Sequence, residues 1–182
     1  IDFTVPSGGS NGKAIHLKTN WDIADLSIYG IGVANNGGGT DGVEYVLPAV
    51  SALAGENILV VRDSLSMALY FGACFAEFDH VFTDANGGIS QNGDDAIELF
   101  KDSVAFEVFG DVDVDGTGQP WEYLDSWAFK NNGQWIFGGV NCTNTGSTTF
   151  TSLCPYPICT VVLADSLTLA GDGGATTITV KG

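Results

Sequence analysis

Basic residues are scarce in this sequence. Its 182 residues include 6 Lys and Arg against 22 Asp and Glu, which gives a formal net charge of −16. Binding to nucleic acid or to an anionic membrane surface needs a broad basic patch, so we expect neither as a partner. The excess of acid has two interpretations: a solvated acidic surface, or carboxylates that coordinate cations.

Long apolar runs are also lacking. No stretch reaches the roughly 18 consecutive apolar residues that a membrane-spanning helix needs, so we expect no transmembrane segment. The first residue is Ile rather than Met, and no signal peptide follows it. We therefore expect a mature or excised segment.

Cysteine and histidine are few. The four cysteines are Cys74, Cys142, Cys154 and Cys159. Their spacing does not form paired Cys-x-x-Cys motifs and neither histidine is close to them in sequence, so structural zinc is disfavoured. Disulfides are the better interpretation, and they indicate an oxidising, extracellular or cell-surface location. Two local pairings are equally feasible, Cys142 with Cys154 and Cys154 with Cys159.

What the chain does contain is glycine, at 25 residues, and many short apolar segments. Alternating or continuous apolar patterns between glycine-rich turns predict an all-β fold, with strands at 14–19, 27–34, 58–62, 96–100 and 104–109. The last two form a predicted hairpin that turns at Lys101 and Asp102. Alternation in the first strand places His16 on an exposed face.

One segment, 64–78, is the only helical candidate, with Ser64 as its cap and Gly72 as an interruption. We expect a short helix or a buried loop there. After Cys159 the chain changes character: 160–169 and 175–180 are strand-like and flank a glycine-rich turn. This tail is predicted to be either a terminal hairpin or a linker arm with one strand to lend.

An acidic loop follows the hairpin. Asp111, Asp113, Asp115, Gly116 and Glu122 match the spacing of a calcium loop, D-x-[DN]-x-[DN]-G-x5-E. Alternate carboxylates converge in such loops, the glycine permits a sharp turn, and Thr117 would add its backbone carbonyl. The sequence thus predicts a Ca²⁺ site, with Asp125 as a replacement for Glu122. The alternative is an acidic inter-strand loop that holds no metal.

Aromatic residues cluster after this loop. Trp121 and Tyr123 are candidates for stacking against a sugar ring, and the alternative is that the cluster belongs to the core. Asp94 and Asp95 are adjacent carboxylates. Because successive strand side chains point to opposite faces, we expect them to bind turn amides rather than to act as a glycosidase pair.

The order of three segments, NGKAIHLKTNWDIADLSIYGIGVANNG, GENILVVRDS and NGDDAIELFKDSVAFEVFG, resembles a bacterial lamin-tail-like domain. The resemblance covers residues 1–159 and is most specific at 93–110. It implies an immunoglobulin-like β-sandwich with long Gly-rich loops and one short helix at most. It also implies an extracellular binding or structural module without catalytic residues. The tail, 160–182, has no counterpart in the family pattern.

Three functions are therefore considered. The first is a non-catalytic, secreted or cell-surface structural or adhesive module that assembles into filaments when its tail adds a strand to another copy. Its partners would be copies of itself or other surface and matrix proteins. The second is a calcium-dependent glycan-binding module. The third, and the least favoured, is a hydrolase that uses the acids of the acidic loop.

Overall fold

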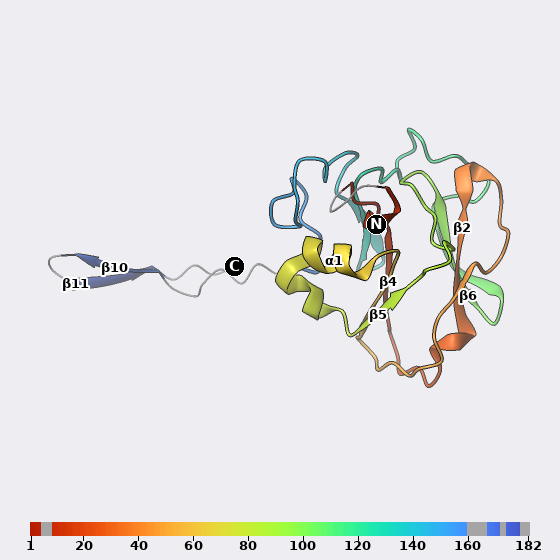
Figure 1. The fold of residues 1–182 in the computed structure, drawn as a ribbon, viewed down its shortest axis with the longest axis horizontal. Helices are drawn as coiled ribbons and strands as arrows, with labels where there is room; N and C mark the ends of the chain where they lie inside the picture. Colours follow the sequence, from red (N-terminus) through yellow and green to blue (C-terminus); the bar gives the residue numbers. More distant parts are fainter. Residues whose placement is uncertain (5–8, 160–166, 172–173, 179–182) are drawn as a thin grey trace.

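Two β-sheets face each other across an apolar core, and a helical layer covers the far side of one sheet (Figure 1). The computed structural model describes residues 1–4, 9–159, 167–171 and 174–178. Figure 1 shows the layers in order: α1 (Ser64–Phe71), then β4 (Asn57–Val61) and β5 (His80–Thr83), then β2 (Tyr29–Ala34) and β6 (Ala96–Lys101). The described chain is β-rich and has one short α-helix, as its composition and patterns predict.

The sheets differ in size. One has the strand order β1-β4-β5 and the other β3-β2-β6-β7, while β8–β9 and β10–β11 are separate two-stranded hairpins. Their pairings are antiparallel except that of β4 with β5. The remaining bounds are β1 (Ala14–Lys18), β3 (Tyr45–Val46), β7 (Val104–Phe109), β8 (Ala128–Asn131), β9 (Gln134–Phe137), β10 (Leu167–Gly171), β11 (Gly174–Ile178), and the 3₁₀ helices η1 (Gly9–Gly12), η2 (Leu26–Ile28), η3 (Asn35–Gly37) and η4 (Gly72–Glu77).

Strand β4 is buried on both faces, which explains its unbroken apolar run. Ile58 and Val60 point into the intersheet core, where they meet residues of β1 and β2. Leu59 and Val61 point the other way, into the helix-side core beneath α1. A strand between two apolar layers has no polar face, so the prediction of a central strand here is confirmed.

Helix α1 packs on that second face. Met67, Tyr70 and Phe71 are fully buried in the helix-side core. The helix begins after Asp63, whose carboxylate accepts the N–H of Ser66 at 2.6 Å, and it ends at Gly72, which has a φ of 56°. The predicted helix is confirmed, but Ser64 is not its cap. The Asp63 carboxylate, which accepts a backbone N–H of the first helical turn, fills that role.

The hairpin of β6 and β7 is also confirmed, with a turn one residue later than predicted. Asp102 and Ser103 both have positive φ, 51° and 63°, which matches a type I′ turn and the twist of the strands. Both faces of β6 are covered. Ile97 and Leu99 pack against the intersheet core, while Ala96, Glu98 and Phe100 are buried on the opposite face.

The prediction that His16 is exposed is wrong. Its ring is half-buried on the outer face of β1, against Phe78, Phe129 and Tyr156. Strand alternation placed it opposite the intersheet core correctly, but that outer face is itself covered by the helical layer and by β8. Burial lowers the pKa of His16 to about 4.

In the C-terminal segment, β10 pairs with β11, so the part of the tail that the structure describes is a hairpin. Figure 1 shows these two strands well apart from the facing sheets. The predicted start of the first tail strand, at 160–166, and the predicted end of the second, at 179–180, lie outside the described residues. Among the residues described, no helix is long and apolar enough to cross a membrane.

Candidate functional site

The acidic loop, residues 111–122, follows β7 on the surface. Asp111, Asp113 and Asp115 are exposed. The carboxylate of Asp111 accepts the N–H of Asp113 at 3.1 Å, and that of Asp115 accepts the N–H of Thr117 at 2.9 Å. The backbone N–H of Thr117, followed by its hydroxyl, holds the pKa of Asp115 below its usual range. These carboxylates therefore close local turns in their own loop.

The side chains of Glu122 and Thr117 also make hydrogen bonds, the first within the loop and the second to Asp94 outside it. Glu122 accepts the N–H of Gly118 at 2.8 Å, and the Thr117 hydroxyl donates to Asp94 at 2.9 Å. Among the described residues, no group of three or more His, Cys, Asp or Glu is placed to hold a metal ion. In this arrangement the five predicted ligands lie in one loop but do not surround a common point, and calcium binding there stays a prediction.

The loop is fixed to the turn that precedes β6. The N–H of Gly116 donates to the Asp94 carbonyl at 2.8 Å, and the N–H of Tyr123 donates to the Gly93 carbonyl at 2.7 Å. Gly116 must be glycine, because a Cβ there would collide with the Asp94 carbonyl and with the ring of Trp121. The acidic run thus forms a braced surface loop.

Asp95 joins this turn to a third segment. Its side chain is fully buried, and its two oxygens accept the N–H groups of Asn36 at 2.7 Å and Asn92 at 2.9 Å. The expectation that this carboxylate binds turn amides is therefore confirmed. It links the glycine-rich loop after β2 to the start of β6.

The predicted stacking role of Tyr123 is wrong. Tyr123 is 2% exposed, contacts Phe109, and donates its hydroxyl to the Asp95 carbonyl at 3.2 Å. Trp121 is half-buried and lies over Gly110 and Gly116. The reason is that the loop turns back onto β7, so the aromatic side chains fill the space beneath it.

Exposed aromatic rings gather elsewhere, at a cleft lined by residues of both facing sheets. Trp21 is 47% exposed and Phe106 is 50% exposed, and their rings meet edge to face at 6.4 Å. Tyr29 lies behind Phe106 at 6.3 Å. The cleft is also lined by charged and apolar residues, Lys18, Glu107, Leu17, Ile23 and Leu99 among them. We call it the aromatic cleft.

Sequence reasoning missed the aromatic cleft because its residues come from distant segments. Trp21 lies in the short connection after β1, and Phe106 lies on β7, far along the chain.

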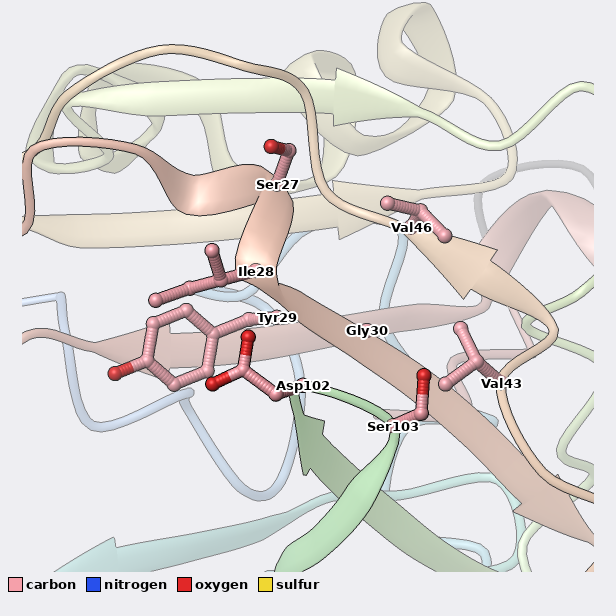
Figure 2. A pocket seen from close by; sticks show the side chains of 8 residues that line it. All are labelled: Ser27, Ile28, Tyr29, Gly30, Val43, Val46, Asp102 and Ser103. Carbon is pink, nitrogen blue, oxygen red and sulfur yellow. The ribbon is translucent and has the colours of Figure 1, made fainter.

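A second, shallow pocket of about 330 Å³ lies over the start of β2 (Figure 2). It forms because β3 is only two residues long and pairs with Gly30 and Ile31, which leaves the beginning of β2 uncovered on that side. Figure 2 shows Asp102 and Ser103 of the β6–β7 turn across Gly30 from Val43 and Val46. Its walls are mainly apolar, and Asp102 is its one charged residue.

Strand β7 is an open edge. It pairs with β6 on one side, and among the described residues no strand pairs with its other side. Val104 is 69% exposed, and Phe106 and Val108 are exposed as well. The exposed residues of β9, which include Trp135, Ile136 and Phe137, adjoin this edge through the contact of Trp135 with Phe109 at 4.6 Å. Exposed apolar side chains on an unpaired edge are unusual, because they invite pairing with another strand.

The loop-rich region after β9 is stapled. Cys142 and Cys154 form a disulfide, with Cα atoms 5.8 Å apart, which decides between the two pairings left open by the sequence. The indole of Trp127 donates to the Cys154 carbonyl at 2.8 Å, and Tyr156 is buried in the helix-side core. Cys74 and Cys159 are thiols in the structure.

Comparison with protein-family models, with curated proteins and with solved structures gave no match. The surfaces that stand out by their own geometry are the open edge of β7 and the aromatic cleft beside it, which share Phe106.

Proposed function

We propose that this chain is a non-catalytic structural or adhesive module of a secreted or cell-surface protein, and that it associates with further copies by strand addition at β7. The observation that carries the proposal is the unpaired edge of β7 with Val104, Phe106 and Val108 exposed along it. An extended segment that paired there would satisfy the free backbone groups of β7 and cover these side chains.

The donor in this proposal is the C-terminal hairpin of a neighbouring copy. Strands β10 and β11 supply extended backbone away from the facing sheets (Figure 1). The edge itself carries little charge that would oppose docking, because Glu107 is paired with Lys130. A contact of this kind joins two different surfaces, the tail of one copy and the edge of the next. Repeated without closing, it produces filaments.

The fold that we propose is the immunoglobulin-like sandwich of lamin-tail-like domains. Two features support it: the two facing sheets, and the β6–β7 hairpin formed by the segment in which the resemblance is most specific. The Cys142–Cys154 disulfide supports an oxidising compartment.

The test is sedimentation velocity of the full chain beside a chain that ends at Cys159. The full chain should assemble and the shorter chain should stay monomeric, with its near-UV circular dichroism retained. The two hydrophobic cores lie within residues 1–159, so the shorter chain keeps them. Equal assembly of both chains would sink the proposal.

A matched pair of variants locates the interface. Phe106→Lys places a charge on the β7 edge and should abolish assembly. Val46→Lys, at a 58% exposed position on the opposite edge of the same sheet, should leave assembly unchanged. If both variants behave alike, the interface lies elsewhere.

A second candidate is a glycan-binding module, and the aromatic cleft is the specific observation that favours it. Exposed Trp21 and Phe106 offer ring faces, and Lys18 and Glu107 offer polar contacts to hydroxyl groups. Trp21→Ala should then abolish binding on a glycan array and leave assembly intact. An array that stays silent with and without Ca²⁺ would count against this candidate.

A further inference from the structure

Cys74 and Cys159 come together in the helix-side core although the sequence separates them widely. Cys74 lies in η4 and is buried, and Cys159 is half-buried against the same core. Both side chains pack in one apolar cluster, and the Cys74 thiol adds to the effect of burial in raising the pKa of Cys159. The Thr149 hydroxyl also reaches Cys159.

The backbones on both sides are held. Gly72, with a φ of 56°, ends α1 and turns the chain into η4. On the other side, the N–H of Cys159 donates to the Tyr156 carbonyl at 3.0 Å, and Tyr156 is anchored in the core. Since Cys142 and Cys154 are joined to each other, these two thiols have no competing cysteine partner in the chain.

We propose that Cys74 and Cys159 form a second structural disulfide, which fastens the residue that precedes the tail to the helical layer. This bond would close a loop that contains nearly half of the chain. The Cys142–Cys154 bond closes a much shorter loop, because its two cysteines are separated by only 12 positions. Constraining the longer segment removes more conformational freedom from the unfolded chain. This inference does not depend on the strand-addition proposal.

The oxidation requires a disulfide-bearing oxidant, such as oxidised glutathione or a thiol–disulfide oxidoreductase. A Cys159 thiolate attacks one sulfur of the oxidant, forms a mixed disulfide and releases one thiol. The Cys74 thiolate then attacks the Cys159 sulfur and releases the second thiol. Two protons leave the cysteines and two electrons pass to the oxidant, which ends as two thiols.

The environment of the pair sets when this occurs. Burial, and then the Cys74 thiol, raise the pKa of Cys159 far above its ordinary value. The folded protein therefore holds a protonated, poorly nucleophilic thiol. We therefore expect oxidation to be faster in a partly folded chain, where both thiols are more exposed to the oxidant.

The test begins with a thiol count. Protein made in an oxidising compartment is denatured and alkylated without reductant, and its non-reduced peptides are mapped by mass spectrometry. We expect no free thiol and a linked pair of peptides that contain Cys74 and Cys159. Two free thiols, or a linkage of either residue to Cys142 or Cys154, would overturn the proposal.

Stability gives a second readout. The double variant Cys74→Ala, Cys159→Ala should melt roughly 10 °C below the oxidised wild type. When the wild type and the double variant are both reduced in denaturant and refolded with reductant present, their melting temperatures should nearly coincide. Cys142→Ala, Cys154→Ala, which opens the smaller ring, should lower the melting temperature less. An oxidised double variant that melts with the wild type would contradict a structural bond.

Discussion

Protonation of His16 is opposed by the aromatic side chains around it. Nε2 lies 3.1 Å from Asn57 Oδ1, and Nδ1 lies 3.0 Å from the Tyr156 hydroxyl. Because Asn57 donates its amide to the Glu77 carbonyl, its Oδ1 is free to accept, and we infer that the proton of His16 resides on Nε2. Nδ1 then accepts from Tyr156. This neutral tautomer satisfies every polar atom of the ring.

The pKa of His16 predicts a pH-dependent stability. It is about 4 in the fold against 6.5 for a free side chain, so the unfolded chain takes up this proton first as pH falls. Stability is fully present above pH 6.5 and should fall between pH 6.5 and about 4, by on the order of 3 kcal/mol. Urea denaturation at several pH values measures the slope.

The matched variants are His16→Gln and His80→Gln. His16→Gln should be less stable at pH 7 and should lose much of the slope, while His80→Gln should keep it. An unchanged slope in His16→Gln would contradict this account of the ring.

The buried carboxylate of Asp95 should contribute to stability through the two backbone groups that it accepts. Asp95→Ala would leave the N–H groups of Asn36 and Asn92 without their acceptors in a buried turn, which should cost about 2–4 kcal/mol of unfolding free energy. Its neighbour supplies the control, because the less buried Asp94 accepts only from the Thr117 hydroxyl and the Asn92 amide and leaves no backbone N–H without an acceptor, so Asp94→Ala should cost less than about 1 kcal/mol. The denaturant midpoints of the two variants measure these losses of unfolding free energy. Equal losses would contradict a special role for Asp95.

At the scale of elements, the sequence predicted those strands whose apolar pattern is decided locally. The alternation in β1 and the continuous run in β4 located both strands, and the β6–β7 hairpin followed from its pattern and turn. The parallel pairing of β5 with β4 could not be predicted, because partner choice depends on contacts with α1 and η4. The aromatic cleft was missed for the same reason: Trp21 and Phe106 meet only after folding.

The acidic loop can be tested directly for calcium binding. Calcium at 100 times its Kd would stabilise the folded state by roughly 2.7 kcal/mol. If the sequence pattern is a true site, thermal melts in Ca²⁺ and in EDTA should differ, and Asp111→Asn together with Asp113→Asn should remove the difference. Identical melting temperatures in Ca²⁺ and in EDTA would contradict calcium binding by this loop.

At the scale of the molecule, charge should govern assembly. Each copy carries a formal charge of −16, so copies repel each other. The screening length falls from about 30 Å at 0.01 M salt to about 10 Å at 0.1 M, and an apolar edge contact gains from that screening. Sedimentation velocity should therefore show stronger association as salt rises. Weaker association would indicate an interface held by ion pairs instead.

The position of Tyr156 has a consequence for the order of events during synthesis. Its ring contacts Phe3, Phe71 and Phe129, and its hydroxyl meets His16, 140 positions away. The helix-side core therefore cannot be completed until almost all of the domain has left the ribosome. Contacts of such long range also slow folding. We expect stalled nascent chains to stay protease-sensitive until Tyr156 has emerged, and earlier protection would contradict this. Until Tyr156 has emerged, Phe3 and Phe71 lack one of the rings that bury them in the native core.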